Sequence, residues 1–344
     1  MSANWVELDG SEGEGGGQIL RSSLALSLLT GRPFHLRNVR ARRSKPGLQP
    51  QHLMSVRAAA TIGQAQTQGA SLGSKDLVFE PGAVVPGEYR FDIGTAGATS
   101  LVLHTLYLPL ALRGKEPSTL TLVGGTHVLA SPCFHFLQKT WSAHLQQMGL
   151  DVNLKMIRPG FYPRGGGIVE ATIRPCQELK AVRHGARGRV SLSGFSFVAG
   201  LPEDIAYRQA RRAAQRLKTK RLHIDINIET WLGGPGTGIG IIAETGPVPV
   251  LFFGLGARGK LAEKVADEAV DRVLAYLEAV NAAIDAHSAD QIVLPLALAV
   301  GSSSFQTGEV TSHLLTNIAV IRQFLERKIQ CPSKQGQPGE VHIA

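Results

Sequence analysis

An internal repetition constrains the fold of this chain more than any other feature of its sequence. A unit of strand, Gly-containing turn, apolar helix, strand, second helix and further strand occurs twice in succession, and this alternation is typical of an α/β (α+β) fold. The first copy predicts strands at residues 5–8, 34–39 and 77–79 and helices at 18–30 and 51–62. The second copy predicts strands at 89–93, 119–123, 152–157 and 168–173 and helices at 99–112 and 134–148.

A third copy is incomplete and comes late in the chain. Residues 290–300 resemble the first helix of the unit, and residues 312–327 resemble the second. The preceding segment predicts strands at 190–198, 222–228, 239–244 and 248–253 and helices at 203–217 and 261–283. We therefore predict a large domain of residues 1–184 and 285–344, with a small α/β domain of residues 185–284 inserted in the third repeat.

The charge balance favours a polyanionic partner. The chain has 36 Lys and Arg against 27 Asp and Glu, which gives a net charge of +9 with His neutral. A positive field of this size favours nucleic acid or nucleotide phosphates, although charge alone does not identify the partner. The hydrophobic share of 43% excludes a disordered or fibrous chain.

Cysteine usage and apolar segment lengths bear on the cellular location. Cys133, Cys176 and Cys331 are too dispersed for a disulfide framework or a close-spaced zinc site, which indicates a reducing compartment. The longest apolar stretches, residues 101–112 and 292–300, are too short to span a bilayer, and residues 1–9 lack a targeting pattern. We expect a soluble, unprocessed, cytoplasmic protein with no membrane partner.

A glycine-rich turn precedes the first predicted helix. Residues 12–18 are Glu-Gly-Glu-Gly-Gly-Gly-Gln, and Arg21 follows Gln18 by one helical turn. Glycines let backbone N–H groups approach an anion at the positive end of a helix, where Glu14 could hold Mg²⁺ and Arg21 a phosphate oxygen. The alternative is a flexible turn, because the spacing matches neither a Walker A loop nor a dinucleotide-binding fingerprint.

Two segments are rich in basic residues. Residues 32–45 contain six Lys and Arg side chains, including Arg40 and Arg43, and Gln51 and His52 then open a helix. Guanidinium groups grip phosphates through two hydrogen bonds, so this segment predicts phosphate binding, with a solvated basic loop as the alternative. In residues 208–221, the spacing of Arg208, Arg212 and Arg216 favours the wet face of an amphipathic helix over an RNA-contacting surface.

Residues 254–260 resemble a phosphate-binding P-loop in sequence. Their sequence, Gly-Leu-Gly-Ala-Arg-Gly-Lys, follows a predicted strand and precedes a helix, but the next residue is Leu261. A P-loop needs Ser or Thr there to bind Mg²⁺. We therefore predict a tight turn.

His313 is a candidate nucleophile. Thr311 or Ser312 can cap the predicted helix, which puts His313 in the first turn, where the positive helix end disfavours imidazolium. A neutral imidazole can attack a phosphoryl group and form a phosphoramidate, which replaces one hard displacement with two easier ones. The alternative is a structural histidine.

An ordered set of motifs along almost the whole chain resembles the RNA 3′-terminal phosphate cyclase family. The motifs are Asp9-Gly10 with Glu14-Gly-Gly-Gly-Gln-Ile-Leu-Arg21, Lys45-Pro-Gly-Leu48 with Gln51-His-Leu53, Gly160-Phe-Tyr-Pro-Arg-Gly-Gly-Gly167, Asp290-Gln291, and Ser312-His-Leu-Leu-Thr-Asn317. The resemblance implies a large domain of three βαβαββ-type repeats, as in enolpyruvyl transferases, with a small α/β domain inserted in the third.

The same resemblance implies an ATP-dependent enzyme of the ligase class. Such enzymes convert an RNA 3′-phosphate into a 2′,3′-cyclic phosphodiester and release AMP and pyrophosphate, with ATP and a divalent metal, Mg²⁺ or Mn²⁺, as cofactors. It implies that His313 forms a covalent His–AMP with the α-phosphate of ATP, with the metal near Glu14. AMP then passes to the RNA 3′-phosphate, and the adjacent 2′-hydroxyl expels it.

The remaining site residues are also expected from the resemblance. Gln18, Arg21, Arg40, Arg43, Gln51 and His52 should line the phosphate and RNA pocket. Asp290 and Gln291 should lie near the adenosine, with Pro132 on one face of the adenine. Where many relatives have Tyr this chain has His287, which leaves the adenine-stacking partner open. The chain also departs from relatives at His104 and Thr126-His127, and we assign no function to these positions.

Two other functions share these sequence features. A noncatalytic branch of the same family acts in ribosomal RNA maturation but lacks the nucleophilic histidine, whereas His313, Glu14 and the arginines are all present here. An enolpyruvyl transferase could use the same repeat architecture and would need no nucleotide, because a shared fold does not establish shared chemistry. The sequence favours the cyclase and leaves the physiological RNA and the oligomeric state open.

Overall fold

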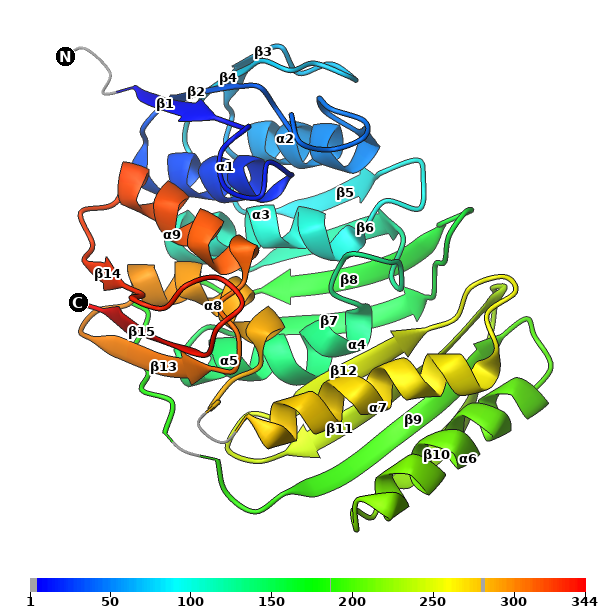
Figure 1. Cartoon of the computed structure of the whole chain (residues 1–344). Coiled ribbons are helices and arrows are strands. Elements are labelled where there is room, and N and C mark those ends of the chain that lie inside the picture. Colours follow the sequence, from blue (N-terminus) through cyan, green and yellow to red (C-terminus); the bar gives the residue numbers. More distant parts are fainter. Residues whose placement is uncertain (1–4, 186, 280–281) are drawn as a thin grey trace.

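The first repeat forms a sheet covered by two helices. The computed structural model describes residues 5–185, 187–279 and 282–344 (Figure 1). The elements of the first repeat are β1 (Val6–Asp9), α1 (Gln18–Thr30), β2 (Phe34–Arg37), α2 (Pro50–Ile62), β3 (Gln66–Gln68) and β4 (Leu77–Glu80). The strand order is β1-β2-β4-β3, with β1 and β2 parallel and the other neighbours antiparallel.

The second repeat has the same topology. Its elements are β5 (Glu88–Asp92), α3 (Thr99–Arg113), β6 (Ser118–Gly124), the helical segments α4 (Phe134–Phe136), η1 (Leu137–Trp141) and α5 (Ser142–Gln147), β7 (Val152–Arg158) and β8 (Gly167–Ile173). The order β5-β6-β8-β7, again with one parallel and two antiparallel pairs, matches the first repeat strand for strand. This agreement confirms the repetition predicted from the sequence.

The third repeat is interrupted after its first strand. Its elements are α8 (Ala286–Leu298), β13 (Ser303–Thr307), α9 (Ser312–Phe324), β14 (Ile329–Gln330) and β15 (Gly339–Ile343), in the strand order β13-β15-β14. The segment at 180–183 pairs in parallel with 300–304, through Lys180 with Val300 and Arg183 with Ser304. It takes the place that β1 and β5 hold in the other repeats, so the insertion separates this strand from α8.

The inserted segment forms a sheet with two helices of its own. Its elements are β9 (Ser191–Ala199), α6 (Asp204–Thr219), β10 (Asp225–Trp231), β11 (Gly236–Glu244), β12 (Val250–Leu255) and α7 (Ala262–Glu278), in the strand order β10-β9-β11-β12. The helix predicted at 261–283 ends at Glu278, and residues 280 and 281 of that prediction lie outside the described residues.

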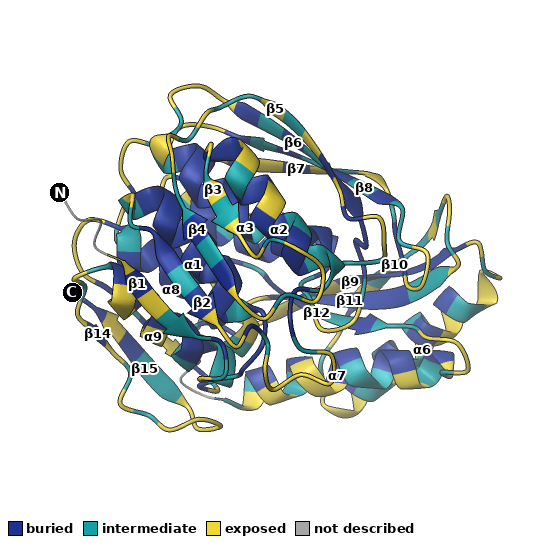
Figure 2. Cartoon of the chain, turned by 90° about the horizontal axis from the view of Figure 1, so that it is seen from above, coloured by how far each residue is buried: buried dark blue, intermediate teal, exposed yellow. Residues whose placement is uncertain are grey.

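The helices of the repeats share one core. α1 and α3 are buried on nearly all sides, because their sequences are apolar around the whole helix, and both appear dark blue in the interior in Figure 2. The strands instead alternate, as in β8, where every second residue is buried. Each sheet therefore covers the helices with one face and leaves its other face toward solvent. In the shared core the helices of different repeats lie side by side, with their amino ends close together.

Aromatic rings join the insert to the second repeat. Phe197 of β9 stacks on Trp231 of β10 with ring centroids 3.6 Å apart and planes 11° apart. Phe161 and His127 of the second repeat pack against Phe197, at 6.0 and 5.7 Å. On its other face the insert has a separate hydrophobic cluster with α6 and α7. The division into two domains, with boundaries at 185 and 284, stays a prediction.

Several elements differ from the sequence-based prediction. β3, β13, β14 and β15 were not predicted, since short strands such as Gln66–Gln68 carry polar residues without an apolar alternation. α8 begins four residues before the predicted Asp290, because the carboxylate of Asp285 accepts hydrogen bonds from the backbone N–H groups of His287 and Ser288. In the described ranges, no helix combines the length and apolar character that a bilayer crossing requires.

We predict that Gly236→Ala destabilises the contact between the insert and the second repeat. A Cβ atom at Gly236 would lie 2.5 Å from two ring atoms of Phe161, so the ring or the strand must move. Overpacking of this kind costs about 1–3 kcal/mol, which urea unfolding would measure. Gly246→Ala is the matched control, because no atom lies within 4 Å of its Cβ position. Equal unfolding free energies for both variants would contradict the prediction.

Candidate active site

The glycine-rich loop before α1 is folded tightly against neighbouring side chains. Gly13 and Gly15 have positive φ angles of 54° and 59°, a conformation that other residues rarely adopt. A Cβ atom at Gly16 would lie 2.6 Å from Arg43 Nη2, and one at Gly17 would lie 2.5 Å from His52 Nε2. The glycines therefore allow a guanidinium group and an imidazole ring to approach the backbone at the positive end of α1.

Glu14 lies at the centre of this cluster. Its side chain is only 4% exposed and forms an ion pair with Arg43. His313 Nδ1 lies 3.3 Å from Glu14 Oε2. The other oxygen, Oε1, accepts the backbone N–H of Gln18 at 3.1 Å. The backbone N–H of Glu14 itself donates to Thr316 Oγ1 of α9 at 3.1 Å. Glu14 thus links the loop, the basic segment and α9, through its carboxylate to Arg43 and His313 and through its backbone N–H to Thr316.

The arginines give the cluster an excess of positive charge. Burial lowers the pKa of Arg21 to about 10, with Glu14 opposing the shift and Arg43 and Arg40 adding to it. Burial, then Arg43, also lowers the pKa of Arg40, whose Nη1 donates to the carbonyl of Gly47 at 3.0 Å. A pKa of about 10 still leaves the Arg21 guanidinium charged at neutral pH. An anion is the ligand that such a site favours.

His52 is held neutral beside these arginines. Burial, together with the positive charges of Arg21, Arg40 and Arg43, lowers its pKa to about 3. Within the described residues, His52 Nδ1 is buried without a hydrogen-bond partner. A buried polar atom is costly to leave unpaired, so a bound ligand or water is expected to complete its hydrogen bonding.

His313 lies in the first turn of α9. Of the two predicted caps, Thr311 is the one observed, because its Oγ1 accepts the N–H of Leu314 at 3.0 Å. Burial lowers the pKa of His313, Glu14 opposes this, and Arg21, Arg43 and His287 reinforce it. The lowered pKa favours the neutral ring, and a side chain that is 44% exposed is still accessible. These are the properties expected of a nitrogen nucleophile.

A hydrogen-bond network fixes α1, α8 and α9 around this histidine. Arg21 Nη2 donates to Gln18 Oε1 at 2.6 Å, and Gln18 Nε2 donates to Asn317 Oδ1 at 2.8 Å. Asn317 Nδ2 then donates to the carbonyl of Asp290 at 2.8 Å. The Asp290 carboxyl group accepts the hydroxyl of Thr311, the residue that caps α9. Movement of any one helix therefore disturbs the position of the others.

The structure brings some predicted residues together and leaves others apart. Glu14, Gln18, Arg21, Arg40, Arg43, His52, Asp290 and His313 belong to the connected cluster. Gln51 Oε1 instead accepts the N–H of Ala98 at 2.9 Å, which ties α2 to the β5–α3 loop. Pro132 and Gln291 are half-buried, and in the described part of the chain no hydrogen bond or ion pair joins them to His313.

Sequence reasoning gave no function to three polar residues that complete the network. Thr316 and Asn317 lie three and four residues after His313, so they share a side of α9 with it and point toward α1. Ser22, four residues after Gln18, donates to Asn317 Oδ1 at 2.6 Å. Helical spacing from the predicted residues is the signal that could have identified all of them.

The residues present fit a metal that is held mainly by a nucleotide. Over residues 5–185, 187–279 and 282–344, no group of three or more His, Cys, Asp or Glu side chains is placed to hold a metal ion. Glu14 supplies one carboxylate at the positive end of α1. Mg²⁺ commonly uses one or two carboxylates with phosphate oxygens and water, so a single carboxylate agrees with a metal that arrives with its nucleotide.

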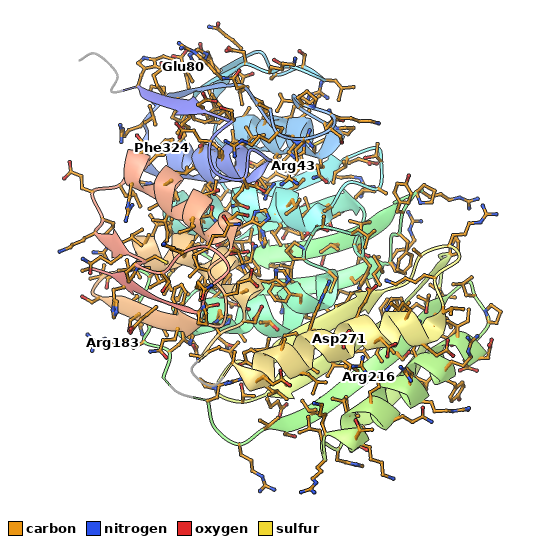
Figure 3. All side chains as sticks on the ribbon, in the orientation of Figure 1. Arg43, Glu80, Arg183, Arg216, Asp271 and Phe324 are labelled. Atoms are coloured by element: carbon orange, nitrogen blue, oxygen red, sulfur yellow. The ribbon has the colours of Figure 1, made fainter. Side chains whose placement is uncertain are left out.

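Two other basic features are structural. Arg208 pairs with Glu263 at 2.9 Å, Arg212 with Asp267 at 2.8 Å, and Arg216 with Asp271 at 2.8 Å. Figure 3 shows Arg216 and Asp271 on the facing helices α6 and α7. Lys260 of the P-loop-like segment donates to the carbonyl of Leu255 at 2.9 Å and pairs with Glu268, which closes the predicted tight turn. Acidic side chains of the insert therefore pair with these arginines and with Lys260.

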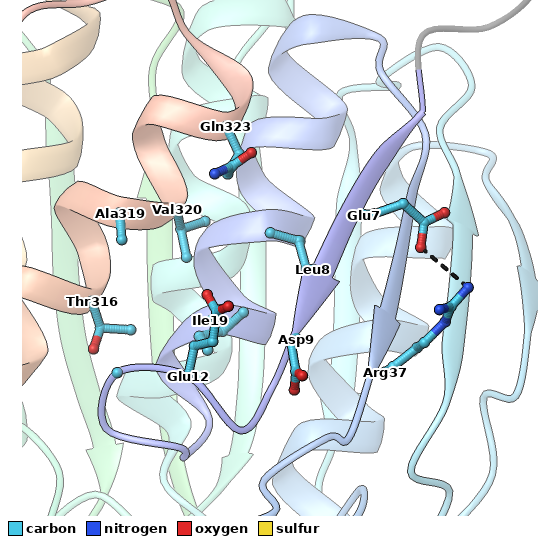
Figure 4. Close-up of a pocket in the computed structure, with 11 residues that line it drawn as sticks. Glu7, Leu8, Asp9, Glu12, Ile19, Arg37, Thr316, Ala319, Val320 and Gln323 are labelled. Carbon is cyan, nitrogen blue, oxygen red and sulfur yellow. Dashed lines mark ion pairs between the residues drawn. The ribbon is translucent and has the colours of Figure 1, made fainter.

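A cavity of about 330 Å³ lies next to the cluster, between β1, α1 and α9 (Figure 4). It shares Gly13 and Thr316 with the glycine-rich loop, but its other polar lining residues include Glu7, Asp9 and Glu12. Hydrogen bonds from Ser11 and Asn38 lower the pKa of Asp9, so its carboxylate stays ionised. Carboxylates repel phosphate, so the arginine side of the loop is the candidate anion site.

Comparisons with known proteins agree in one family. A family model described as RNA 3′-terminal phosphate cyclase matches residues 12–331. The RNA 3′-terminal phosphate cyclase of Ectopseudomonas mendocina is 43% identical over 337 residues, which cover 96% of both chains. The proteins of that name from Caldivirga maquilingensis and Pseudomonas fluorescens are 44% and 45% identical, and each alignment covers at least 94% of both chains.

We predict that Asp290→Asn changes how stability depends on pH. Burial raises the pKa of Asp290 to about 8, Thr311 opposes this through its hydrogen bond, and the charges of Asp285, Glu14 and Glu309 add to it. The pKa of an Asp in an unfolded chain is about 3.9. Between this value and the folded pKa, the Asp290 carboxyl group is protonated in the folded wild type and ionised in the unfolded one. The wild type therefore loses stability as pH rises through this window.

The Asn side chain cannot ionise and avoids this loss. The unfolding free energy of Asp290→Asn minus that of the wild type should rise from about pH 5 to about pH 8, as measured by urea unfolding at several pH values. The subtraction cancels groups that titrate equally in both proteins. A difference that is constant or that falls with pH would contradict the prediction.

Proposed function

This chain belongs to the RNA 3′-terminal phosphate cyclase family, and on that premise we propose that it cyclises RNA 3′-phosphate ends with ATP. The product is a 2′,3′-cyclic phosphodiester, and AMP and pyrophosphate are released. The observation that carries the proposal is the placement of a neutral His313 beside Glu14 and a cluster of arginines at the amino ends of α1 and α9. The physiological RNA stays open, because phosphate and sugar contacts carry little sequence information.

In the first step His313 becomes adenylylated. Nδ1 faces the Glu14 carboxylate, which favours the tautomer with its proton on Nδ1 and leaves Nε2 with a free lone pair. Nε2 attacks the α-phosphorus of ATP, a P–N bond forms, and the bond to the β-phosphate oxygen breaks as pyrophosphate leaves. Arg21, Arg40 and Arg43 offset the negative charge of the phosphates, so catalysis depends on position and charge.

Two further transfers complete the reaction. A 3′-phosphate oxygen of RNA attacks the same phosphorus, the P–N bond breaks, and AMP is joined to the RNA end through a pyrophosphate linkage. The neighbouring 2′-hydroxyl then attacks the 3′-phosphorus, loses its proton and expels AMP. This last step is intramolecular, so the nucleophile is already oriented by the ribose. Gln18 and His52 belong to the same side-chain cluster and are proposed to hold the terminal phosphate.

Glu14 is the residue that would hold Mg²⁺ or Mn²⁺ together with the phosphates. A divalent metal supplies charge neutralisation for the leaving pyrophosphate when it is bound. For Glu14 to contribute an oxygen, Arg43 or His313 must share the carboxylate or release it, since both now contact Oε2. Glu14 is thus proposed to orient His313 as well as to serve as a ligand.

The adenosine is proposed to lie over the start of α8. Asp290 and Gln291 are in this helix, and Pro132 lies before α4. His287 is exposed and close enough to His313 to lower its pKa. We propose His287 for the second face of the adenine, in the place where many relatives carry Tyr. We also propose that the three repeats are similar in fold to the repeats of enolpyruvyl transferases.

A covalent labelling experiment tests the proposed function. The protein is incubated with ATP labelled at the α-phosphate and Mg²⁺, and we expect label on the protein that is labile in acid and stable in alkali, as a P–N bond requires. RNA ending in a 3′-phosphate should discharge the label, and RNA ending in a 3′-hydroxyl should not. His313→Ala should carry no label.

The control variant is His287→Ala, a nearby exposed histidine that is not the proposed nucleophile. It should still become labelled, with weaker ATP binding if its ring contacts the adenine. Absence of label on the wild type would refute the cyclase proposal, and label that persists in His313→Ala would refute the assignment of the nucleophile.

We also predict where RNA phosphates are neutralised. Arg208→Ala, Arg212→Ala and Arg216→Ala combined should leave the salt dependence of RNA binding unchanged, because these arginines pair with acidic residues of α7. Arg43→Ala should reduce the slope of log K against log salt by about 0.7, the value for one phosphate contact with a single strand. A reduced slope in the triple variant would place RNA on α6 and contradict the prediction.

A further inference from the structure

Two loops from distant parts of the chain form a groove beside the insert. The β7–β8 loop contributes Pro159 and residues 161–165, and the β10–β11 loop contributes Gly234 and Pro235. The groove has a volume of about 230 Å³. It lies at the meeting of the second repeat and the insert, and the cyclase mechanism above does not use it.

Tyr162, which lines the groove, and two large apolar side chains outside its lining are exposed. Tyr162 in the β7–β8 loop is 80% exposed, and Leu232 in the β10–β11 loop is 90% exposed. Ile157 near the end of β7 is 50% exposed. A single exposed ring is common on protein surfaces, but exposed apolar side chains that gather beside a groove are typical of an interaction site.

The backbone beneath Tyr162 is fixed by its neighbours. Phe161 is only 7% exposed, and its carbonyl accepts the N–H of Gly165 at 2.7 Å. A Cβ atom at Gly165 would lie 2.5 Å from the carbonyl oxygen of Thr95, and its φ of 66° also favours glycine. The loop is thus packed against the β5–α3 loop, and Tyr162 is presented on a preorganised support. Preorganisation reduces the entropy that binding would cost.

The charges at the groove favour an anion. Arg164 is exposed and, within the described residues, makes no hydrogen bond or ion pair. Arg158, an exposed residue outside the groove lining, uses its Nε to donate to the carbonyl of Gly166 at 2.8 Å, and its terminal nitrogens have no partner among the described residues. The described lining residues include no acidic side chain. An exposed ring beside uncompensated guanidinium groups is the combination that single-stranded nucleic acid binds, by stacking and by phosphate contacts.

The groove is connected to the candidate active site through one loop. Gln51, next to His52, accepts the N–H of Ala98 in the β5–α3 loop, and Thr95 of that loop contacts Gly165. Figure 1 shows the β7–β8 loop on the same side of the molecule as the ends of β5 and β6 that lead into helices. An RNA chain with its 3′ end at His313 reaches this loop if it leaves the site on that side of the molecule.

We propose that this groove binds an unpaired nucleotide upstream of the RNA 3′ end, with the base stacked on Tyr162 and its phosphate held by Arg164. The inference rests on the proposed cyclase function for the direction of the RNA. Stacking tolerates any base, so the groove adds affinity without sequence preference. RNA whose last nucleotides are paired would lose this contact.

Substrate length provides the test. Discharge of the labelled protein is measured with a nucleoside 3′-phosphate and with an unstructured ten-nucleotide RNA 3′-phosphate. Tyr162→Ala should raise the KM of the longer RNA about 5- to 150-fold, the equivalent of one lost stacking contact. The KM of the nucleoside 3′-phosphate and the rate of labelling by ATP should not change, and Tyr162→Phe should behave as the wild type.

Tyr207→Ala is the matched control, because Tyr207 is also exposed, at 52%, but lies on α6 away from the groove. An unchanged KM for the long RNA in Tyr162→Ala, or an equal rise for both substrates, would overturn the proposal. So would a change of oligomeric state in Tyr162→Ala without loss of RNA affinity, which would make a second copy the occupant. If the wild type takes no label, fluorescence anisotropy with the same RNA still decides whether Tyr162 contributes to binding.

Discussion

The sharing of the Glu14 carboxylate between Arg43, His313 and the N–H of Gln18 is the interaction on which the site depends. A buried carboxylate is stable only if it is paired, and here its partners come from the first and third repeats. Loss of this contact would leave a buried charge unpaired and would release His313 from the glycine-rich loop. The same contact that stabilises the fold therefore sets the orientation of the proposed nucleophile.

The repeat architecture explains why so many charged groups meet at one place. Each repeat directs its helices inward, and the apolar surfaces of α1, α3 and α8 pack into a common core. The amino ends of α1, α2 and α9 then carry Gln18, His52 and His313 to neighbouring positions. Their unpaired N–H groups and positive dipole ends favour anions, and burial keeps His52 and His313 neutral beside the arginines.

Some arginines of this protein stabilise the fold, and others are available to bind an anion. The arginines of α6 are neutralised by α7, so they hold the insert together, whereas Arg164 at the groove has no such partner in the described part of the chain. A basic stretch in the sequence thus does not identify an RNA surface. The tertiary environment of each guanidinium group decides whether it can bind a phosphate.

The sequence by itself determined the repeats, the inserted segment and the family motifs, because periodicity and glycine spacing depend on neighbours close in the chain. It also identified His313 as a candidate nucleophile and the glycine-rich loop, with Glu14, as a candidate site for phosphate and metal. Only the tertiary structure decided that Asn317 joins Gln18 to Asp290, that the arginines of α6 are paired, and that Tyr162 stands beside the insert. These contacts join residues far apart in the chain, and local pattern carries no information about which distant side chains folding brings together.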